Sequence, residues 1–231
     1  MTDIGRYRLV VFDCDGTMVD SQHNIIAAMI EAWRRHGLDE PTPDLIRRQV
    51  GLTLEIAIAR MLAAVDQGGE PAFVSAVANT YREIVDGVRQ RADVDEPMFD
   101  GMRELIEALA APEIFLGVAT GKNMAGLEHT LQGLGLRDRF HTLQTADRCR
   151  SKPDPEMVIR AMAETVNAPE STVVIGDTSF DMEMARAAGA TPIGVAWGYH
   201  PAEELHAAGA VAVLQYPGEL IDCLQRLSAN R

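Results

Sequence analysis

Two acidic residues stand directly after a short apolar run near the start of the chain. The run "LVVF" at residues 9–12 is followed by "DCDGT" at residues 13–17. Alternate side chains of an extended chain point to opposite sides, so Asp13 and Asp15 would share one side while Cys14 would turn away into packing. Paired carboxylates can attack an electrophile, move a proton or hold a metal ion.

Polar residues also follow two other apolar runs, and one lysine precedes a proline. These residues are Thr120, Gly121 and Lys122 in "IFLGVATGK", Asp177 and Asp181 in "TVVIGDTSFD", and Lys152 in "SKPDP". Singly, each fits a helix cap, a turn or a solvated surface. Functional groups of open α/β sheets gather at the carboxyl ends of strands, so their combination predicts one shared site.

The elements that must position these residues alternate along the chain. Strands are predicted at 7–13, 114–120, 140–146, 172–177, 191–197 and, more weakly, 210–214, and helices at 125–136, 155–167, 181–189 and 217–227. This alternation predicts an α/β fold, a Rossmann-like doubly wound parallel sheet covered on both faces.

An insertion follows the first strand, because about a hundred residues precede the second, far more than a crossover needs. It shows helical spacing at 24–36, 43–50, 54–65 and 71–91, broken by "HGLDEPTP" and "DQGGEP". We therefore expect an α/β core domain at residues 1–19 and 97–231 and an all-helical cap domain at residues 20–96.

The net charge and cysteine content of the chain limit the kinds of molecule it is expected to bind. The 231 residues carry a formal net charge of -13, which disfavours binding to nucleic acid or to an anionic membrane. Three cysteines without CxxC spacing suggest neither a disulfide framework nor a zinc site, and no signal peptide or membrane span is evident. We expect a cytoplasmic protein, a monomer or a homodimer.

Four motifs together resemble those of the haloacid dehalogenase superfamily, specifically its phosphoglycolate-phosphatase-like branch. "DCDGT" matches the DxDGT motif, "VATGK" the strand-end threonine motif, "SKPDP" the lysine motif and "GDTSFD" the acidic motif, in the family's order. The predicted helical insertion lies where this branch carries its cap. The resemblance covers essentially the whole chain.

The two aspartates of the first motif, Asp13 and Asp15, fit different roles in phosphoryl transfer. An ionised aspartate can attack a phosphomonoester without prior deprotonation, so Asp13 is the expected nucleophile that forms an aspartyl-phosphate. Asp15 is the expected general acid for the leaving alcohol and then the general base for water.

Other motif residues fit phosphate and metal binding. Gly16 would let the chain turn beside the phosphate, Thr120 and Gly121 would donate to its oxygens, and Lys152 would supply positive charge. Lys122 either contacts substrate or lies in solvent.

Mg²⁺ is the expected cofactor, because it prefers hard oxygen ligands. Asp13, Asp177 and the main-chain carbonyl of Asp15 are its expected ligands. By resemblance, Asp181 orients Lys152 or a metal-bound water.

The leaving group must be recognised by the cap. By resemblance, the turn "RRQVGLTLE" faces the active site, so Arg47, Arg48 and Gly51 are candidates for substrate specificity. Each arginine fits equally a solvated helix face.

The predicted function is Mg²⁺-dependent hydrolysis of a small phosphorylated metabolite, with phosphoglycolate as the leading substrate. Two alternatives remain. One is a phosphosugar mutase of the β-phosphoglucomutase type, which Thr17 fits less well than a phosphatase, and the other is a non-catalytic phospho-ligand-binding protein.

Overall fold

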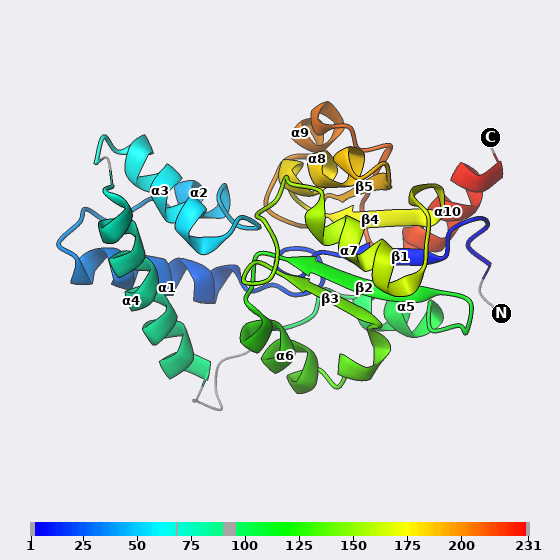
Figure 1. Cartoon of the computed structure of the whole chain (residues 1–231), viewed down its shortest axis with the longest axis horizontal. Helices are drawn as coiled ribbons and strands as arrows, with labels where there is room; N and C mark the ends of the chain where they lie inside the picture. Colours follow the sequence, from blue (N-terminus) through cyan, green and yellow to red (C-terminus); the bar gives the residue numbers. More distant parts are fainter. Residues whose placement is uncertain (1–2, 68, 90–95, 230–231) are drawn as a thin grey trace.

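The core of the protein is a six-stranded parallel sheet with helices on both faces (Figure 1). The computed structural model describes residues 3–67, 69–89 and 96–229. The strands are β1 (Leu9–Phe12), β2 (Phe115–Thr120), β3 (Thr142–Thr145), β4 (Thr172–Gly176), β5 (Thr191–Val195) and β6 (Ala212–Leu214), in the order β3-β2-β1-β4-β5-β6. The predicted Rossmann-like α/β fold is confirmed.

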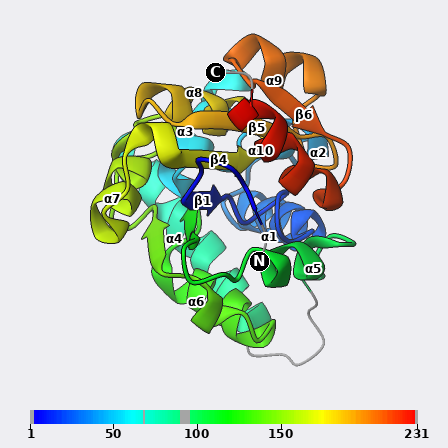
Figure 2. The same ribbon diagram turned by 90° about the vertical axis from the view of Figure 1, so that its right-hand side faces the viewer.

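Side-chain alternation along β1 explains why helices cover both faces of the sheet. Val10 and Phe12 point into a core shared with α5 (Met102–Ala108), α6 (Met124–Gly133) and α10 (Leu220–Ala229). Leu9 and Val11 point into a second core with α7 (Glu156–Thr165) and α8 (Ser179–Ala187). Figure 2 shows α7 and α5 on opposite sides of β1 and β4. A strand buried on both faces reads as a continuous apolar run, as this one does.

Two short helices were not predicted from the sequence. These are α5 (Met102–Ala108) and α9 (Ala202–Ala208). Each has seven residues, too few for a helical repeat to stand out from its neighbours. The predicted helices and strands are present with ends shifted by a few residues.

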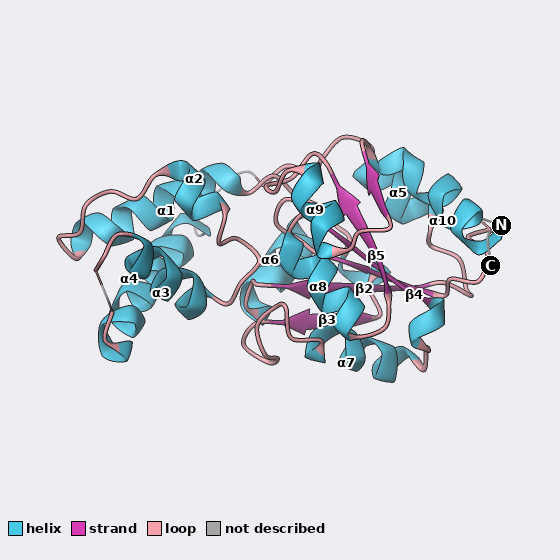
Figure 3. Ribbon diagram, turned by 90° about the horizontal axis from the view of Figure 1, so that it is seen from above, coloured by secondary structure: helices cyan, strands magenta, loops and turns pink. Residues whose placement is uncertain are grey.

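Four helices between β1 and β2 form the cap: α1 (Gln22–Arg35), α2 (Pro43–Arg47), α3 (Leu54–Ala64) and α4 (Pro71–Arg89). Their apolar faces pack on one another around the fully buried Trp33. Residues 90–91 of the last predicted cap helix lie outside the described residues. In Figure 3 the cap lies beyond the arrowheads of β2 and β3, so it faces the carboxyl ends of these strands.

The two connections between core and cap run side by side. Val19 and Met98 form an antiparallel bridge, the Asp20 amide donates to the Pro97 carbonyl at 2.8 Å, and the Phe99 amide donates to the Met18 carbonyl. The sequence further predicts hinges for cap movement at residues 19–21 and 96–99, and these segments form the two connections. Movement of the cap about them stays a prediction.

None of the helices in the described part of the chain is both long and apolar enough to cross a membrane.

Candidate active site

The sheet order places three motif-bearing strand ends next to one another. β1 pairs with both β2 and β4, so Asp13 follows β1 between Thr120, the last residue of β2, and Asp177, the first residue after β4. Strand order reverses at β1 and β4, which is where open α/β sheets bind their ligands. Lys152 reaches this point from the loop between β3 and α7.

Lys152 joins the first and last acidic motifs through two short ion pairs. Its ammonium lies 2.6 Å from Asp13 Oδ1 and 2.6 Å from Asp181 Oδ1, and all three side chains are buried. The other oxygen of Asp181 accepts hydrogen bonds from the amide and hydroxyl of Thr178, which cap α8. Asp181 is therefore fixed by the helix start and can orient Lys152.

Asp13 keeps one oxygen without a partner. Its Oδ2 is buried and accepts no hydrogen bond from any described residue. Burial raises the pKa of Asp13 to about 7, although the neighbouring Lys152 acts to lower it. A buried carboxylate oxygen with no donor needs a cation or a ligand to offset the loss of water.

Asp177 is held by groups from two loops. The Thr17 hydroxyl donates to its Oδ1 at 2.9 Å, and the Tyr199 amide donates to its Oδ2 at 2.9 Å. Thr17 thus ties the first motif to the acidic motif that follows β4, rather than only fixing its own turn. Gly16 has φ +86°, and a Cβ there would overlap the Asp177 carboxylate, so the turn requires glycine.

The acidic cluster fits a divalent cation. Asp13, Asp177 and Asp181 each offer an oxygen, and these oxygens lie within 4.8 Å of one another. Burial, together with the charges of Asp13 and Asp181, raises the pKa of Asp177 well above its usual range. Lys152 compensates part of this negative charge, and hard carboxylate oxygens are the ligands that Mg²⁺ prefers. The unpartnered oxygen of Asp13 is open to such a bond.

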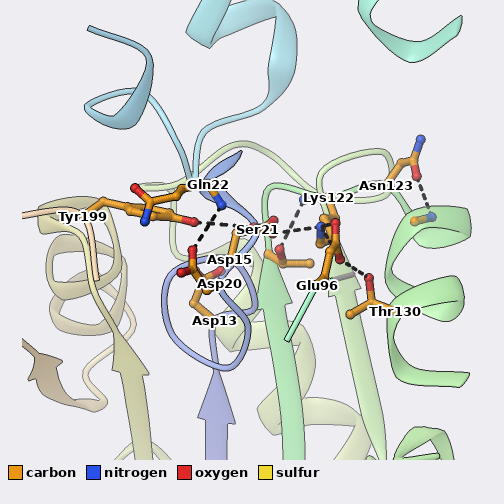
Figure 4. Close-up of polar contacts among 12 residues, drawn as sticks. Asp13, Asp15, Asp20, Ser21, Gln22, Glu96, Lys122, Asn123, Thr130 and Tyr199 are labelled. Carbon is orange, nitrogen blue, oxygen red and sulfur yellow. Dashed lines mark hydrogen bonds and ion pairs between the residues drawn. The ribbon is translucent and has the colours of Figure 1, made fainter. Parts of the chain in front are cut away.

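Asp15 belongs to a separate network that reaches both core–cap connections (Figure 4). The Ser21 hydroxyl donates to Asp15 Oδ1 and lies 3.4 Å from the Tyr199 hydroxyl. The Lys122 ammonium lies 2.8 Å from Asp15 Oδ1 and 3.3 Å from Glu96 Oε1. Ser21 is on the outgoing connection and Glu96 on the returning one, so the position of Asp15 depends on both.

Lys122 is thereby removed from solvent. Its side chain is 9% exposed, which excludes the solvated alternative left open by the sequence. Burial alone would lower the pKa of Lys122, but Asp15 and Glu96 outweigh it and raise this pKa above its usual range. Lys122 is a fixed cation beside Asp15.

Thr120 and Gly121 lie at the end of β2, as their motif predicts. The Thr120 hydroxyl accepts a hydrogen bond from the Lys122 amide at 3.2 Å, which tightens the turn. A Cβ on Gly121 would lie 2.8 Å from the Leu52 carbonyl oxygen of the cap and 2.9 Å from that of Gly51. Glycine lets the cap turn approach the strand end closely.

A cavity of about 560 Å³ separates the cap from the strand ends. Asp15, Gly121 and Lys122 line it on the core side. The cap contributes the turn at residues 49–54 and side chains of α1, α3 and α4. The proton-transfer candidate therefore faces the space in which a leaving group would lie.

The three cap candidates occupy different places. Gly51 lines the cavity, whereas Arg47 and Arg48 do not. Arg47 pairs with Asp44, and Arg48 lies 2.8 Å from Glu204 on the core surface. Neither arginine lines the cavity, so this geometry does not support a role in substrate recognition, and that role stays a prediction for both.

Three residues of this region were missed from the sequence or assigned elsewhere. Glu96 stands in no motif, and only the fold brings it to the cavity, whereas Gln49 lies in the cap turn expected to face the site but was not singled out within it. From the sequence alone, His200 in "WGYHP" fits a surface loop better than the rim of the site, but it is 5% exposed, and its Nδ1 accepts a hydrogen bond from the Ser179 amide. A histidine shortly after a strand end gives no signal for such burial.

Comparison with known sequences identifies the family. Residues 10–195 match the sequence profile of the haloacid dehalogenase-like hydrolases. The chain is 32% identical over 225 residues to an N-acetylmuramic acid 6-phosphate phosphatase of Pseudomonas aeruginosa, covering 96% of each chain. It is 28% identical over 220 residues to a phosphoglycolate phosphatase of Chromobacterium violaceum, covering 94% of this chain and 96% of that protein.

Solved structures share the fold. A hydrolase from Pseudomonas syringae superposes with a TM-score of 0.84 at 23% identity, covering 96% of this chain and 99% of that one. A "predicted phosphoglycolate phosphatase" from Haemophilus somnus 129PT gives a TM-score of 0.83 at 17% identity, covering 96% and 100%.

The chain belongs to the haloacid dehalogenase-like hydrolase family. Within that family it is a phosphoric monoester hydrolase of the phosphoglycolate-phosphatase-like branch.

Proposed function

We propose that the protein hydrolyses a small organic phosphomonoester in a Mg²⁺-dependent reaction that passes through an aspartyl-phosphate on Asp13. The observation that carries this proposal is the environment of Asp13. One oxygen is fixed by Lys152 at 2.6 Å, and the other is buried without a donor at the junction of three strand ends. Carboxylates so placed serve as nucleophiles in covalent phosphoryl transfer.

The reaction has two steps with opposite proton transfers. An oxygen of Asp13 forms a bond to phosphorus while the bond to the leaving oxygen breaks, and Asp15 donates a proton to that oxygen. Water then forms a bond to phosphorus, the bond to Asp13 breaks, and Asp15 accepts the proton of the water. Ser21 and Lys122 hold Asp15 at the cavity for both steps.

Positive charge and fixed donors offset the charge of the phosphoryl group. Lys152, the Thr120 hydroxyl and the Gly121 amide are the protein groups assigned to its oxygens. Asp13, Asp177 and the main-chain carbonyl of Asp15 would hold Mg²⁺, which would neutralise part of that charge. Asp181 acts through Lys152 as a positioning residue.

Two leaving groups are suggested by named relatives. Phosphoglycolate is the substrate predicted from the sequence, and a relative of 28% identity carries that name. The relative of 32% identity is named for N-acetylmuramic acid 6-phosphate, a much larger ester. The alternative mutase would return an isomeric sugar phosphate, and the non-catalytic binder would release no phosphate.

The deciding experiment is phosphate release from p-nitrophenyl phosphate with and without Mg²⁺. Asp13→Asn should reduce Mg²⁺-dependent release to background, because the amide is a poor nucleophile. The control is Asp138→Asn, which makes the same change on the exposed surface. Wild-type release by the Asp13 variant would refute the nucleophile, and product analysis with sugar phosphates would reveal isomerisation.

Location and assembly belong to the proposal as well. All three cysteines, Cys14, Cys149 and Cys223, are free thiols. Unpaired thiols fit a reducing compartment and support the proposed cytoplasmic location. We propose a monomer or a homodimer, and sizing chromatography would distinguish the two.

A further inference from the structure

The cavity between cap and sheet edge carries an inference about the substrate, which rests on the proposed phosphatase function. We propose that the cavity binds an uncharged, polyhydroxylated leaving group of sugar size, rather than the carboxylate of glycolate. We further propose that Gln49 of the cap accepts a hydrogen bond from this leaving group.

The volume of the cavity is the first argument. About 560 Å³ falls within the range of sites that bury most of a drug-sized ligand. Glycolate is a two-carbon acid, so most of this space would hold only water when phosphoglycolate is bound. A sugar ring with its substituents uses far more of the space.

The charges that line the cavity are the second argument. Its three cations already face carboxylates: Arg82 pairs with Glu55, Arg89 lies 3.2 Å from Asp86, and Lys122 contacts both Asp15 and Glu96. Among the described lining residues, five carboxylates outnumber these cations, since Asp147 lines the cavity too. A second anionic group on the substrate would meet net negative charge, which costs free energy in a partly desolvated site.

Gln49 supplies the third argument. It lines the cavity at the turn after α2, and its Oε1 is buried without a hydrogen-bond donor from any described residue. An unpaired acceptor at a binding site selects for a ligand that brings a donor. A hydroxyl or amide N–H is such a donor, whereas the carboxylate of glycolate is not.

Neutral groups elsewhere on the wall complement a hydroxylated ligand. Burial raises the pKa of Tyr81 to about 12, so its phenol stays protonated at neutral pH. The side-chain Oδ1 of Asn123 accepts a hydrogen bond from the Gly126 amide at 2.8 Å (Figure 4). Asn123 lines the cavity, and this bond leaves its side-chain amino group to donate to a ligand. A hydroxyl group both donates and accepts, so it matches Gln49 and these donors alike.

The apolar part of the wall fits the same ligand. Ile25 and Met29 of α1 and Met61 of α3 line the cavity beside the polar groups. Carbon-bound hydrogens of a ring, or the methyl of an acetamido group, can pack on these side chains. The wall as a whole therefore has polar and apolar parts. Among the described residues, every cation on it has a carboxylate neighbour.

The test compares matched esters on the full-length protein with Mg²⁺. Phosphoglycolate, glucose 6-phosphate, N-acetylglucosamine 6-phosphate and N-acetylmuramic acid 6-phosphate are assayed beside p-nitrophenyl phosphate. We expect kcat/KM for the best uncharged sugar ester to exceed that for phosphoglycolate by roughly tenfold or more, the effect of one or two net hydrogen bonds.

The outcomes of this comparison separate the inference about the leaving group from the proposed phosphatase function. Equal or better hydrolysis of phosphoglycolate overturns the inference and leaves the phosphatase function intact. If kcat/KM for the carboxylated N-acetylmuramic acid ester exceeds that for the uncharged sugar esters by tenfold, the proposal of an uncharged leaving group is overturned. Hydrolysis of none of the esters, including p-nitrophenyl phosphate, overturns the proposed function and the inference with it.

A pair of variants tests Gln49 itself. Gln49→Leu should raise KM for the best sugar ester roughly tenfold, with kcat much less affected, because it removes a ground-state contact. The control is Gln67→Leu: Gln67 Oε1 is likewise buried without a donor, but Gln67 does not line the cavity.

The outcomes for these variants are equally definite. Equal KM values for the Gln49 and Gln67 variants overturn the role of Gln49. Should the leucine variant fail to fold, Gln49→Glu keeps a side chain of similar size and two acceptor oxygens. It should retain a KM for the sugar ester nearer to wild type, and a tenfold rise there would also count against the assignment.

Discussion

The strand ends and the cap face the same cavity but are anchored in opposite ways. At the strand ends, Asp13, Lys152 and Asp181 are buried and joined by ion pairs of 2.6 Å. On the cap side, Arg48 and Glu204 pair across the surface with side chains 53% and 38% exposed. The Thr53 amide of the cap also donates to the Ser151 hydroxyl at 2.9 Å, and the cap helices are held to one another by their apolar core around Trp33.

This difference separates chemistry from recognition. Groups that must be fixed within a fraction of an ångström are set by the sheet backbone, which cannot shift without breaking strand pairing. The groups proposed to recognise the leaving alcohol, Gln49 among them, lie mainly on the cap, whose helices pack on one another. We therefore expect substitutions in the cap to change which ester is bound while leaving phosphoryl transfer intact, and substitutions at the strand ends to remove it.

After the loss expected for Asp13→Asn, the largest effect is expected at Asp15. Asp15→Asn keeps the size of the side chain but cannot transfer the proton, so kcat for an alkyl phosphate should fall by about 10²–10⁴-fold. The loss should be smaller for p-nitrophenyl phosphate, because that leaving group needs little protonation. Steady-state kinetics with the two esters measure this, and an equal loss for both would contradict the acid role of Asp15.

The next effect concerns stability where the two regions join. Lys122→Met leaves the buried carboxylate of Asp15 and the partly buried carboxylate of Glu96 without their cation, and the loss of a buried partner costs about 3–5 kcal/mol. Urea unfolding monitored by circular dichroism measures it. The matched control is Arg137→Met, which breaks a more exposed pair with Glu128 and should cost at most about 1 kcal/mol. Similar losses would show that the Lys122 network does not act as a buried ion pair.

The stability of the protein should depend on pH through the acidic cluster at the strand ends rather than through the cap. The pKa of Asp13 is raised to about 7, so between about pH 4 and pH 7 the native state binds more protons than the unfolded state. Stability of the metal-free protein should fall as pH rises through this window, and Asp13→Asn should flatten the fall. Mg²⁺ binds the ionised carboxylates, so it should raise Tm more at pH 7.5 than at pH 5.

Thermal unfolding in EDTA and in Mg²⁺ across this pH range provides the measurement. A Tm increase from Mg²⁺ that is the same at both pH values would contradict binding at the buried carboxylates.

The smallest effect is expected at the cap surface. Arg48→Ala removes one exposed ion pair with Glu204, so stability should change by less than about 1 kcal/mol. KM for the preferred ester should stay within twofold, because Arg48 does not line the cavity. A large rise in KM would restore Arg48 as a recognition residue and weaken the contrast between the two regions.

The strand-end site was predictable because its determinants are local. Asp13, Thr120 and Asp177 each end or follow an apolar run, and parallel pairing alone brings such ends together. The burial of Cys14 followed from alternation along the same strand and is confirmed, since Cys14 is fully buried. Each of these inferences needed only a few consecutive residues.

The cavity wall was not predictable in this way. Its side chains come from several helices and two loops, and the contacts depend on how the cap packs on the core. Arg48 and Gln49 are neighbours in the turn after α2, and only the path of that turn decides which of the two side chains lines the cavity. Whether Lys122 is buried or solvated was likewise open from the sequence, because only the fold brings Glu96 beside it.

The paired connections at the base of the cap make the insertion easy to exchange. The Asp20 amide nitrogen and the Pro97 carbonyl oxygen are 2.8 Å apart, so removing the intervening segment would leave two chain ends that already lie side by side at an antiparallel bridge. A short hairpin turn could join them without a long closure loop. We therefore expect the core to accept insertions of different length at this point. Evolution or protein engineering could use the same site to exchange the domain that binds the substrate.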